Sequence, residues 1–306
     1  MRFAFLFPGQ GSQCVGMGKD LFDTFETARK RFKQADDVLG RAISDLIFAG
    51  PVESLTATSN TQPALYTVEA VIADILGEKG IAPSVVAGHS LGEYSALYAA
   101  GVVAFKDGLR LVARRGELME NAGREKPGAM AAVMGMDKTR IAEVLATVTS
   151  GIVVLANENT PDQTVISGES SAVAEACGKL KAGGAKRAIS LQVSGAFHSP
   201  LMRAAADQMA SLLSGVRFNE PKCPVITNVT AQPETDQSLL KELLVKQLIS
   251  PVRWVDSMKA LSGMGALQCI ETGPGSVLKG LARKCSGMLN VVAADTVSNI
   301  SSLVLK

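Results

Sequence analysis

The sequence contains few of the residues on which several classes of site depend. It has five cysteines in 306 residues, and no two of them form a Cys-x-x-Cys pair. An odd number of widely spaced cysteines argues against a zinc site or a disulfide framework, and it is typical of free thiols in the reducing cytoplasm. Histidines are scarcer still, because His89 and His198 are the only two. Any reaction that needs an imidazole therefore has two candidates, and no metal site is expected.

Long apolar runs and dense basic runs are also missing. The apolar run near the N-terminus spans Phe3 to Phe7 and ends at Pro8. It is too short for a signal-peptide core or a membrane span, so a buried strand is expected there. The formal net charge is +2 without a cluster of Lys and Arg, which argues against nucleic acid as a partner. With 47% hydrophobic and 20% charged residues, the composition is that of a globular protein with a sizeable core.

Strand and helix patterns alternate over the first 125 residues. Helix-like patterns that end at glycines alternate with short apolar runs; the predicted strands are 3–7 and 84–90, and the predicted helices are 61–80, 91–101 and 105–123. The pattern resumes after Ser194 in the segments "PVITNVT", "ALQCIETGPG" and "SVLKGLARKC". Such alternation predicts an α/β domain with a mainly parallel sheet.

The rhythm changes between residues 126 and 194. The predicted elements there are strands at 128–136, 151–159, 162–169 and 185–194, and helices at 137–149 and 170–184. Their order, βαββαβ, is that of a ferredoxin-like unit. We expect 126–194 to be a small domain inserted into a larger, discontinuous α/β domain formed by 1–125 and 195–306.

The stretch Gly88-His89-Ser90-Leu91-Gly92 lies between a predicted strand and a predicted helix. Gly-x-Ser-x-Gly in this context is the nucleophile-elbow pattern, in which the glycines permit a cramped turn that exposes the serine. The next backbone N–H and the helix N-terminus can then face a developing oxyanion. The alternative interpretation is a structural serine in a glycine turn, and the strand–turn–helix context favours the nucleophile.

A nucleophilic serine needs a base, and histidine is the usual one. In an extended backbone His89 points away from Ser90, so it is expected to brace the turn instead. His198, in "VSGAFHSPLM", is then the candidate base by elimination, although a loop histidine is often a polar surface group. The group that orients it stays open: Asp137 and Asp162 lie between the two residues in sequence, and a backbone carbonyl is the alternative.

An arginine lies on the apolar face of the predicted helix at 105–123. Arg110 and Arg114 share a polar face, whereas Arg115 falls beside Leu111 and Leu118. An internal salt bridge or a side chain that reaches the surface explains this placement without a function. The sharper interpretation is a site for a substrate carboxylate, which arginine binds through two parallel hydrogen bonds.

The glycine-containing loop "FPGQGSQ" at 7–13 follows the first predicted strand. The dinucleotide-binding fingerprint needs a glycine where Cys14 stands, and a phosphate-binding P-loop needs Gly-Lys-Ser/Thr, so both are excluded. A loop at the carboxyl end of a strand can still supply a backbone N–H to an oxyanion hole.

Several motifs in order carry a resemblance to a known family. They are "FPGQGSQ" at 7–13, "GHSLGEYSAL" at 88–97, "RG" at 115–116, "AFHSPLM" at 196–202, "QLISPVRW" at 247–254 and "ETGPGSVLKGL" at 271–281. Together they resemble the malonyl-CoA:acyl carrier protein transacylases of type II fatty acid synthesis, nearly from end to end. The resemblance implies a hydrolase-like catalytic α/β domain with an inserted ferredoxin-like domain.

The resemblance also implies the roles of single residues. Ser90 would be the nucleophile and His198 the base, with the backbone carbonyl of Gln247 orienting the histidine. The backbone N–H groups of Gln10 and Leu91 would form the oxyanion hole. The sixth residue, which would bind the malonyl carboxylate, is Arg115.

The implied reaction is a ping-pong transfer of malonyl from malonyl-CoA to the phosphopantetheine thiol of holo acyl carrier protein, for fatty acid biosynthesis. It needs only proton transfer and charge stabilisation, so no cofactor is expected. The family is usually monomeric, and neither a membrane nor a nucleic acid is expected as a partner. One departure is Gly195, where many malonyl-specific relatives have a histidine; Phe197 still fits the malonyl type.

Two other classes of function remain open on the sequence. One is a serine hydrolase built on the same elbow, against which the arginine argues, because simple ester hydrolysis needs no carboxylate anchor. The other is a non-catalytic subunit that only docks a carrier protein. Retention of Ser90, His198 and Arg115 argues against a dead enzyme.

Overall fold

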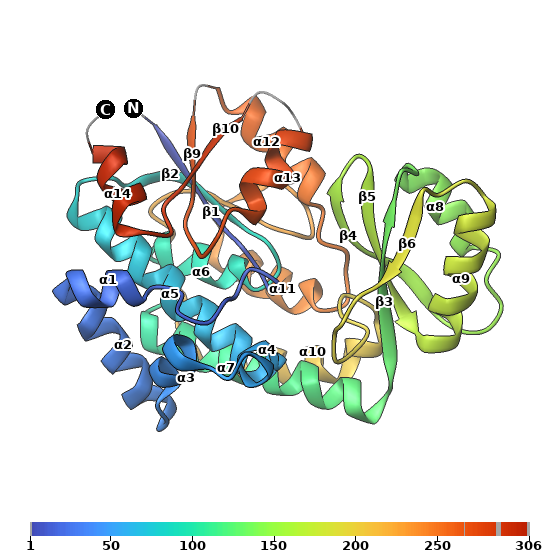
Figure 1. Cartoon of the computed structure of the whole chain (residues 1–306), viewed down its shortest axis with the longest axis horizontal. Helices are drawn as coiled ribbons and strands as arrows, with labels where there is room; N and C mark the ends of the chain where they lie inside the picture. The colour runs from blue at the N-terminus through green and yellow to red at the C-terminus, as the bar shows by residue number, and fades with distance from the viewer. Residues whose placement is uncertain (1, 266, 286–288, 305–306) are drawn as a thin grey trace.

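The structure is a computed structural model that describes residues 2–265, 267–285 and 289–304. The chain forms a larger and a smaller lobe (Figure 1). In the described part of the larger lobe a six-stranded sheet has the order β10 (Asn290–Ala293), β9 (Gln268–Glu271), β1 (Phe3–Phe7), β2 (Pro83–Gly88), β7 (Val225–Ile226) and β8 (Pro233–Glu234). Only the pair of β7 and β8 is antiparallel among these described strands. The predicted α/β class with a mainly parallel sheet is confirmed.

Helices surround this sheet. They are α1 (Lys19–Thr24), α2 (Glu26–Leu39), α3 (Ile43–Ala49), α4 (Val52–Thr56), α5 (Thr58–Glu78), α6 (Gly92–Ala99), α7 (Phe105–Glu125), the short 3-10 helix η1 (Pro200–Met202), α10 (Arg203–Ser214), α11 (Gln237–Gln247), α12 (Trp254–Gly263), α13 (Val277–Cys285) and α14 (Val297–Val304). None of the helices in the described ranges is long and apolar enough to cross a membrane.

Both faces of the larger sheet are buried, and β1 shows why. Phe5 and Phe7 pack into the core formed with α5, α6 and α7, whereas Ala4 and Leu6 pack into a second core with α12 and α13. Alternate side chains of a strand point to opposite faces, so an uninterrupted apolar run is what a strand covered on both faces requires. The lobe is therefore a helix–sheet–helix sandwich.

The smaller lobe contains β3 (Gly128–Met134), α8 (Lys138–Leu145), β4 (Val153–Thr160), β5 (Gln163–Glu169), α9 (Ser170–Ala182) and β6 (Arg187–Ser190), in that chain order. Its antiparallel sheet has the order β4-β5-β3-β6. Val133 and Ile166 pack against α8 and α9 in a separate core, whereas Met130 and Val165 on the other face join the core of the larger lobe. One face of the small sheet is thus turned toward the large lobe.

Two features differ from the sequence patterns. The helices between Lys19 and Thr56 were not predicted. Three of them, α1, α3 and α4, span only five to seven residues, too few for a helical period to show, whereas α2 has 14 residues and buries Ala28, Phe32 and Ala35 at helical spacing, so its pattern was missed. The apolar segment 224–230 is a strand only at Val225–Ile226. After Ile226 the chain turns, with the Ala231 N–H donating to the Thr227 carbonyl at 2.9 Å.

The two lobes are joined by backbone hydrogen bonds along the edge of β4. The Glu158 N–H donates to the Val252 carbonyl, and the Val252 N–H donates to the Ala156 carbonyl, both at 2.8 Å. Val252 forms a parallel bridge with Asn157. The segment between α11 and α12 therefore acts as an added strand of the small sheet.

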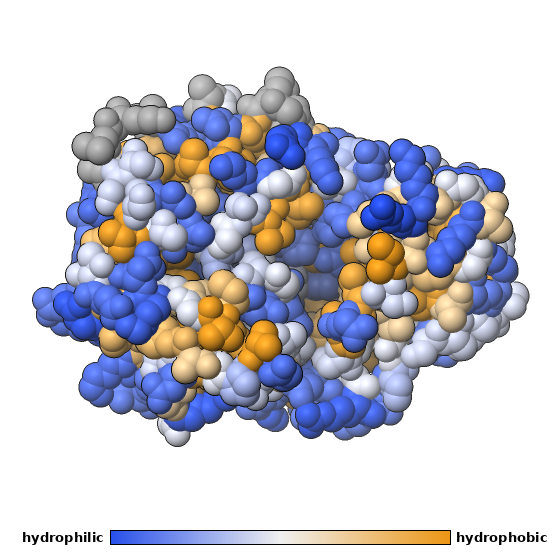
Figure 2. All heavy atoms as spheres, viewed as in Figure 1, coloured by the Kyte–Doolittle hydropathy of each residue, from blue (hydrophilic) through white to orange (hydrophobic). Residues whose placement is uncertain are grey.

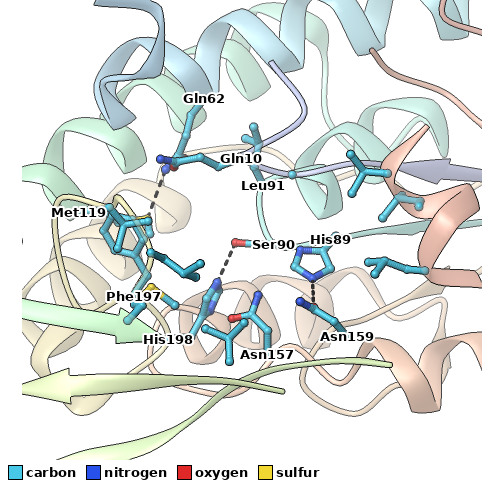
Figure 3. Close-up of a pocket in the computed structure, with 18 of the residues that line it drawn as sticks. Gln10, Gln62, His89, Ser90, Leu91, Met119, Asn157, Asn159, Phe197 and His198 are labelled. Atoms are coloured by element: carbon cyan, nitrogen blue, oxygen red, sulfur yellow. Dashed lines mark hydrogen bonds between the residues drawn. The ribbon is translucent and has the colours of Figure 1, made fainter. Parts of the chain in front are cut away.

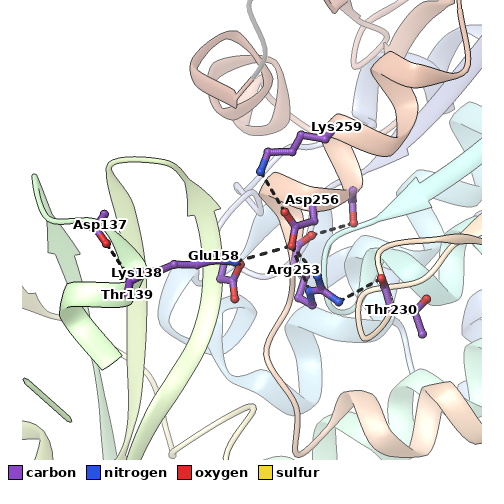
Figure 4. A network of polar contacts seen from close by, with 9 residues as sticks. Asp137, Lys138, Thr139, Glu158, Thr230, Arg253, Asp256 and Lys259 are labelled. Atoms are coloured by element: carbon purple, nitrogen blue, oxygen red, sulfur yellow. Dashed lines mark hydrogen bonds and ion pairs between the residues drawn. The ribbon is translucent and has the colours of Figure 1, made fainter. Parts of the chain in front are cut away.

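Charged side chains reinforce this junction (Figure 4). Lys138 on α8 lies 2.6 Å from the Glu158 carboxylate and 3.8 Å from that of Asp256 on α12. Asp256 also accepts hydrogen bonds from Arg253 and Lys259. Although burial raises its pKa, these hydrogen bonds and the nearby positive charges outweigh burial and lower the pKa of the Asp256 carboxyl. The network fixes α8 beside α12.

Candidate active site

The turn between β2 and α6 presents Ser90 in a left-handed conformation with φ 53°. The flanking glycines are required by close approach. A Cβ on Gly88 would lie 1.9 Å from the carbonyl carbon of Gly92, and a Cβ on Gly92 would lie 2.1 Å from the carbonyl oxygen of Phe7. Because Phe7 at the end of β1 lies opposite Gly88 in the sheet, the loop after β1 runs beside this turn. The glycines therefore permit a strained turn that holds a half-buried serine at the carboxyl edge of the sheet.

His198 lies beside the serine, although 108 residues separate them in sequence. Its Nε2 is 2.8 Å from Ser90 Oγ (Figure 3), and its Nδ1 is 2.8 Å from the backbone carbonyl of Gln247. A carbonyl can only accept, so Nδ1 carries the proton and Nε2 is free to accept from the hydroxyl. Asp137, an alternative orienter on the sequence, instead caps α8 by accepting from two backbone N–H groups. Asp162 lies in the turn between β4 and β5.

The environment keeps the imidazole of His198 neutral. Burial lowers its pKa to about 3, and the positive charge of Arg115 adds to this effect. A histidine that is uncharged at neutral pH can accept a proton without first losing one. The pair therefore has the geometry and the protonation state of a nucleophile with its general base.

Arg115 on α7 is fully buried. Its Nη1 donates to Gln62 Oε1 at 2.8 Å, and its Nη2 donates to Gln247 Oε1 at 2.9 Å and to Ser90 Oγ at 3.1 Å. Burial lowers the pKa of the guanidinium. In the described part of the chain these acceptors are all uncharged, so the internal salt bridge and the surface-reaching side chain are both contradicted. A buried cation held only by neutral oxygens is a place for an anion.

Gln10 and Leu91 both line the cleft in front of the serine. Gln10 lies in the loop after β1, where its side chain donates to Thr58 Oγ1 at 3.2 Å. Leu91 precedes the first residue of α6. Within the described ranges, neither backbone N–H donates to a protein acceptor. Two unused donors beside a nucleophile are what an oxyanion hole needs.

These residues border a cleft of about 200 Å³ that opens to solvent. Figure 2 shows it as a hollow between the two lobes. Figure 3 places Met119 and Phe197 on one side of Ser90 and the polar side chains of Asn157 and Asn159 on the other. The cleft therefore offers an apolar wall and a polar wall to a ligand. Among the described residues, no group of three or more His, Cys, Asp and Glu is placed to hold a metal ion.

His89 lines the same cleft but does not reach the serine hydroxyl. Its Nε2 lies 2.9 Å from Asn159 Oδ1, and its ring packs on Trp254 with 5.5 Å between the ring centres. The expectation that His89 points away from Ser90 requires an extended backbone at this point. The positive φ of Ser90 shows that this premise was wrong, and the contact with Asn159 is what separates His89 from the chemistry.

Three polar residues of the site were missed in the sequence. Asn228 accepts from the Ser90 N–H at 2.7 Å and donates to the Gly88 carbonyl at 2.6 Å, so its side chain fixes the turn. Gln62 holds Arg115, and Glu93 contacts Gln247 and Asn228. Of the three, only Glu93 had a signal in the sequence, because it is an acidic residue in the first turn of the helix and directly follows the Gly-x-Ser-x-Gly stretch.

Comparisons with known proteins agree on one family. Residues 4–298 match the acyl transferase domain family. Over 301 residues the chain is 46% identical to the malonyl CoA-acyl carrier protein transacylase of Bacillus subtilis (strain 168), covering 98% of this chain and 95% of that protein. Over 303 residues it is 42% identical to the enzyme of the same name from Escherichia coli (strain K12), covering 98% of each.

Solved structures give the same result. An acyl carrier protein S-malonyltransferase from Vibrio cholerae superposes with a TM-score of 0.96 at 42% identity, covering 99% of this chain and 100% of that one. A malonyl-transacylase in complex with a type II PKS acyl-carrier protein gives a TM-score of 0.97 at 42% identity, covering 100% and 99%. A serine–histidine pair on an α/β scaffold and a match along nearly the whole sequence lead to one conclusion: the chain belongs to the acyl transferase domain family.

Proposed function

We propose that this protein transfers the malonyl group of malonyl-CoA to the phosphopantetheine thiol of holo acyl carrier protein, and so supplies extender units for fatty acid biosynthesis. The observation that carries the proposal is the position of Ser90 between a neutral base and a buried cation whose hydrogen-bond acceptors, among the described residues, are neutral oxygens. The names of the relatives supply the substrates, and the geometry is consistent with a malonyl-serine intermediate.

In the first half-reaction, His198 Nε2 takes the hydroxyl proton of Ser90 while Oγ attacks the thioester carbonyl carbon of malonyl-CoA. The backbone N–H groups of Gln10 and Leu91 stabilise the oxyanion. When the tetrahedral intermediate collapses, the carbon–sulfur bond breaks, and the CoA thiolate takes the proton from His198. The malonyl group is left as an ester on the serine.

The second half-reaction reverses the proton path. The thiol of the carrier protein gives its proton to His198 as its sulfur attacks the ester carbonyl. The carbon–oxygen bond breaks, and Ser90 Oγ recovers the proton. Both steps move only protons and an acyl group, and the Gln247 carbonyl keeps the imidazole in the required tautomer throughout.

Arg115 would bind the free carboxylate of the malonyl group. Its two terminal nitrogens already point at side-chain oxygens of Gln62 and Gln247, so the guanidinium is held in place before substrate arrives. Charge-assisted hydrogen bonds to a carboxylate are about twice as strong as those to neutral acceptors. Binding of malonyl is therefore favoured over binding of acetyl, which has no carboxylate.

We also propose the domain boundaries and their fold types. Residues 126–194 form a ferredoxin-like domain inserted between 1–125 and 195–306, which form a hydrolase-like catalytic domain. The separate core under α8 and α9 and the strand order β4-β5-β3-β6 support this division. We place the enzyme in the cytoplasm as a monomer; its five cysteines, all in the described part, are free thiols.

The test is intact-protein mass spectrometry after mixing with malonyl-CoA, acetyl-CoA or methylmalonyl-CoA, followed by addition of holo acyl carrier protein. A malonyl adduct on the protein that passes to the carrier thiol is expected, together with no adduct on Ser90→Ala. Release of free malonate in place of transfer would identify a hydrolase. Normal loading of Ser90→Ala would show that another residue is the nucleophile.

A further inference from the structure

The side-chain amide of Gln247 lies between the two halves of the site. Its Nε2 donates to the Ser90 carbonyl at 2.9 Å and to Glu93 Oε2 at 2.7 Å, and its Oε1 accepts from Arg115 Nη2 at 2.9 Å. An amide has one accepting end and one donating end. Which end faces Arg115 decides whether the guanidinium meets an acceptor or is pushed away by another donor.

Glu93, the second residue of α6, removes this ambiguity. Its Oε2 already accepts from the Asn228 N–H, and the Ser90 carbonyl can only accept, so both oxygens require the NH₂ end of the Gln247 amide. The oxygen end is therefore left for Arg115. Asn228 Oδ1 also accepts from Nε2, at 3.3 Å, but Glu93 Oε2 at 2.7 Å is the nearer side-chain acceptor, so Glu93 is the group to vary.

The environment of Glu93 is unusual for a carboxylate. It is 1% exposed and does not line the substrate cleft. Oε2 accepts from Gln247 and from the Asn228 N–H at 3.0 Å, whereas the buried Oε1 has no partner among the described residues. Burial raises the pKa of the Glu93 carboxyl to about 7, and the hydrogen bonds from Gln247 and Asn228 together with the charge of Arg115 offset only part of this cost in free energy. A cost of this kind points to a role outside stability.

We propose that Glu93 is a positioning residue for malonyl selectivity. By fixing the amide of Gln247 so that its oxygen faces Arg115, Glu93 holds the guanidinium in the pose that receives the substrate carboxylate. This inference rests on the proposed function. The acetyl group has no carboxylate that could pair with Arg115. A change in Arg115 therefore alters the malonyl-to-acetyl ratio, whereas damage to the Ser90 turn lowers both loading rates.

The experiment measures kcat/KM for loading by malonyl-CoA and by acetyl-CoA in full-length Glu93→Leu, Glu93→Asp and Glu93→Gln. Leucine removes both acceptors, and a hydrogen bond to a charged group is worth enough for a fall in the malonyl-to-acetyl ratio of about ten-fold or more. Aspartate withdraws the carboxylate by one methylene, and we expect a fall of about five-fold. Glutamine keeps an oxygen for Gln247 and should restore the ratio to within about three-fold of the wild type.

Glu69→Gln is the matched control. Glu69 on α5 is equally buried and accepts a hydrogen bond from Ser95 on α6, the helix that carries Glu93, but it has no hydrogen bond to Gln247 or Arg115. Burial raises its pKa well above the usual value, so the amide resembles the neutral acid that it replaces. The malonyl-to-acetyl ratio of Glu69→Gln should equal that of the wild type.

The outcomes separate the two proposals. A wild-type protein that loads no malonyl would refute the proposed function itself. A wild type that loads malonyl, with a folded Glu93→Leu whose ratio is unchanged, would overturn the role of Glu93 alone. If the leucine variant does not fold, Glu93→Asp decides, and an unchanged ratio in that variant overturns the role equally.

Discussion

Replacing Arg115 by alanine is the perturbation that most directly separates the malonyl group from the acetyl group, which differ by one carboxylate. The guanidinium is fully buried, and its terminal nitrogens contact only the side-chain oxygens of Gln62, Gln247 and Ser90 among the described residues. The substitution therefore removes a positive charge that malonyl can pair with and acetyl cannot.

The magnitude follows from the burial. Breaking a buried ion pair costs about 3–5 kcal/mol. Because about 1.4 kcal/mol corresponds to a ten-fold change in rate, malonyl loading should fall by about two to three and a half powers of ten. The truncation also leaves the amide oxygens of Gln62 and Gln247 without their donor. That disturbance is shared by both substrates, so the ratio of the two rates isolates the contribution of the carboxylate.

The assay is kcat/KM for loading of Ser90 from malonyl-CoA and from acetyl-CoA. Arg115→Lys should recover only part of the malonyl rate, because one ammonium cannot form the two parallel bonds of a guanidinium. Arg114→Ala is the control, since Arg114 lies half exposed on the polar face of α7 and pairs with Glu117 at 2.6 Å. We expect it to behave like the wild type.

Acetyl loading by Arg115→Ala should fall little or rise, since the methyl group no longer faces an unpaired cation. An equal loss of both activities would refute the reasoning. It would mean that Arg115 supports the packing of α7 and the turn, and that the carboxylate binds elsewhere.

Two further predictions concern the base and the turn. Since burial, followed by the charge of Arg115, lowers the pKa of His198 to about 3, malonyl loading should stay nearly constant from pH 7 down to pH 5, and an acid limb near 6.5 would contradict this. Below pH 6.5 the histidine binds a proton in the unfolded protein but not in the folded one. The free energy of unfolding should therefore decrease as the pH is lowered below 6.5, and urea titrations should show a smaller decrease for His198→Ala. Gly92→Ala would place a Cβ 2.1 Å from the Phe7 carbonyl and should destabilise the fold by at least about 1–3 kcal/mol in urea unfolding. Gly280→Ala, a helical position where a Cβ has no neighbour within 4 Å, should stabilise by up to about 1 kcal/mol, and equal behaviour of the two variants would contradict the argument from close approach.

Features that depend on neighbouring residues could be predicted from the sequence. The strand at Phe3–Phe7, the turn around Ser90 and the helix that carries Arg115 each follow from local patterns. The burial of Arg115 followed from helical periodicity, because residues three and four apart share a face. With only two histidines in the chain, the choice of His198 required little more than excluding His89.

The orientation of the base could not be settled in this way. The sequence left Asp137, Asp162 and a backbone carbonyl as alternatives, and only the resemblance to a family favoured Gln247. Every residue carries a carbonyl, so a main-chain acceptor leaves no mark in the sequence. The structure brings the Gln247 carbonyl to 2.8 Å from His198 Nδ1 because the end of α11 packs beside the turn.

The polar residues around the serine and the arginine were decided by tertiary structure alone. These residues come from three separate elements: Gln62 from α5, Asn228 from the turn that follows β7, and Glu93 from α6. They meet only when those elements pack around the carboxyl edge of the sheet. Single polar residues have no periodicity, so nothing in the sequence distinguishes Gln62 or Asn228 from a surface group, and the position of Glu93 after the Gly-x-Ser-x-Gly stretch does not show which residues it contacts. Local patterns determined which residues could react, and long-range packing determined which groups hold them in place.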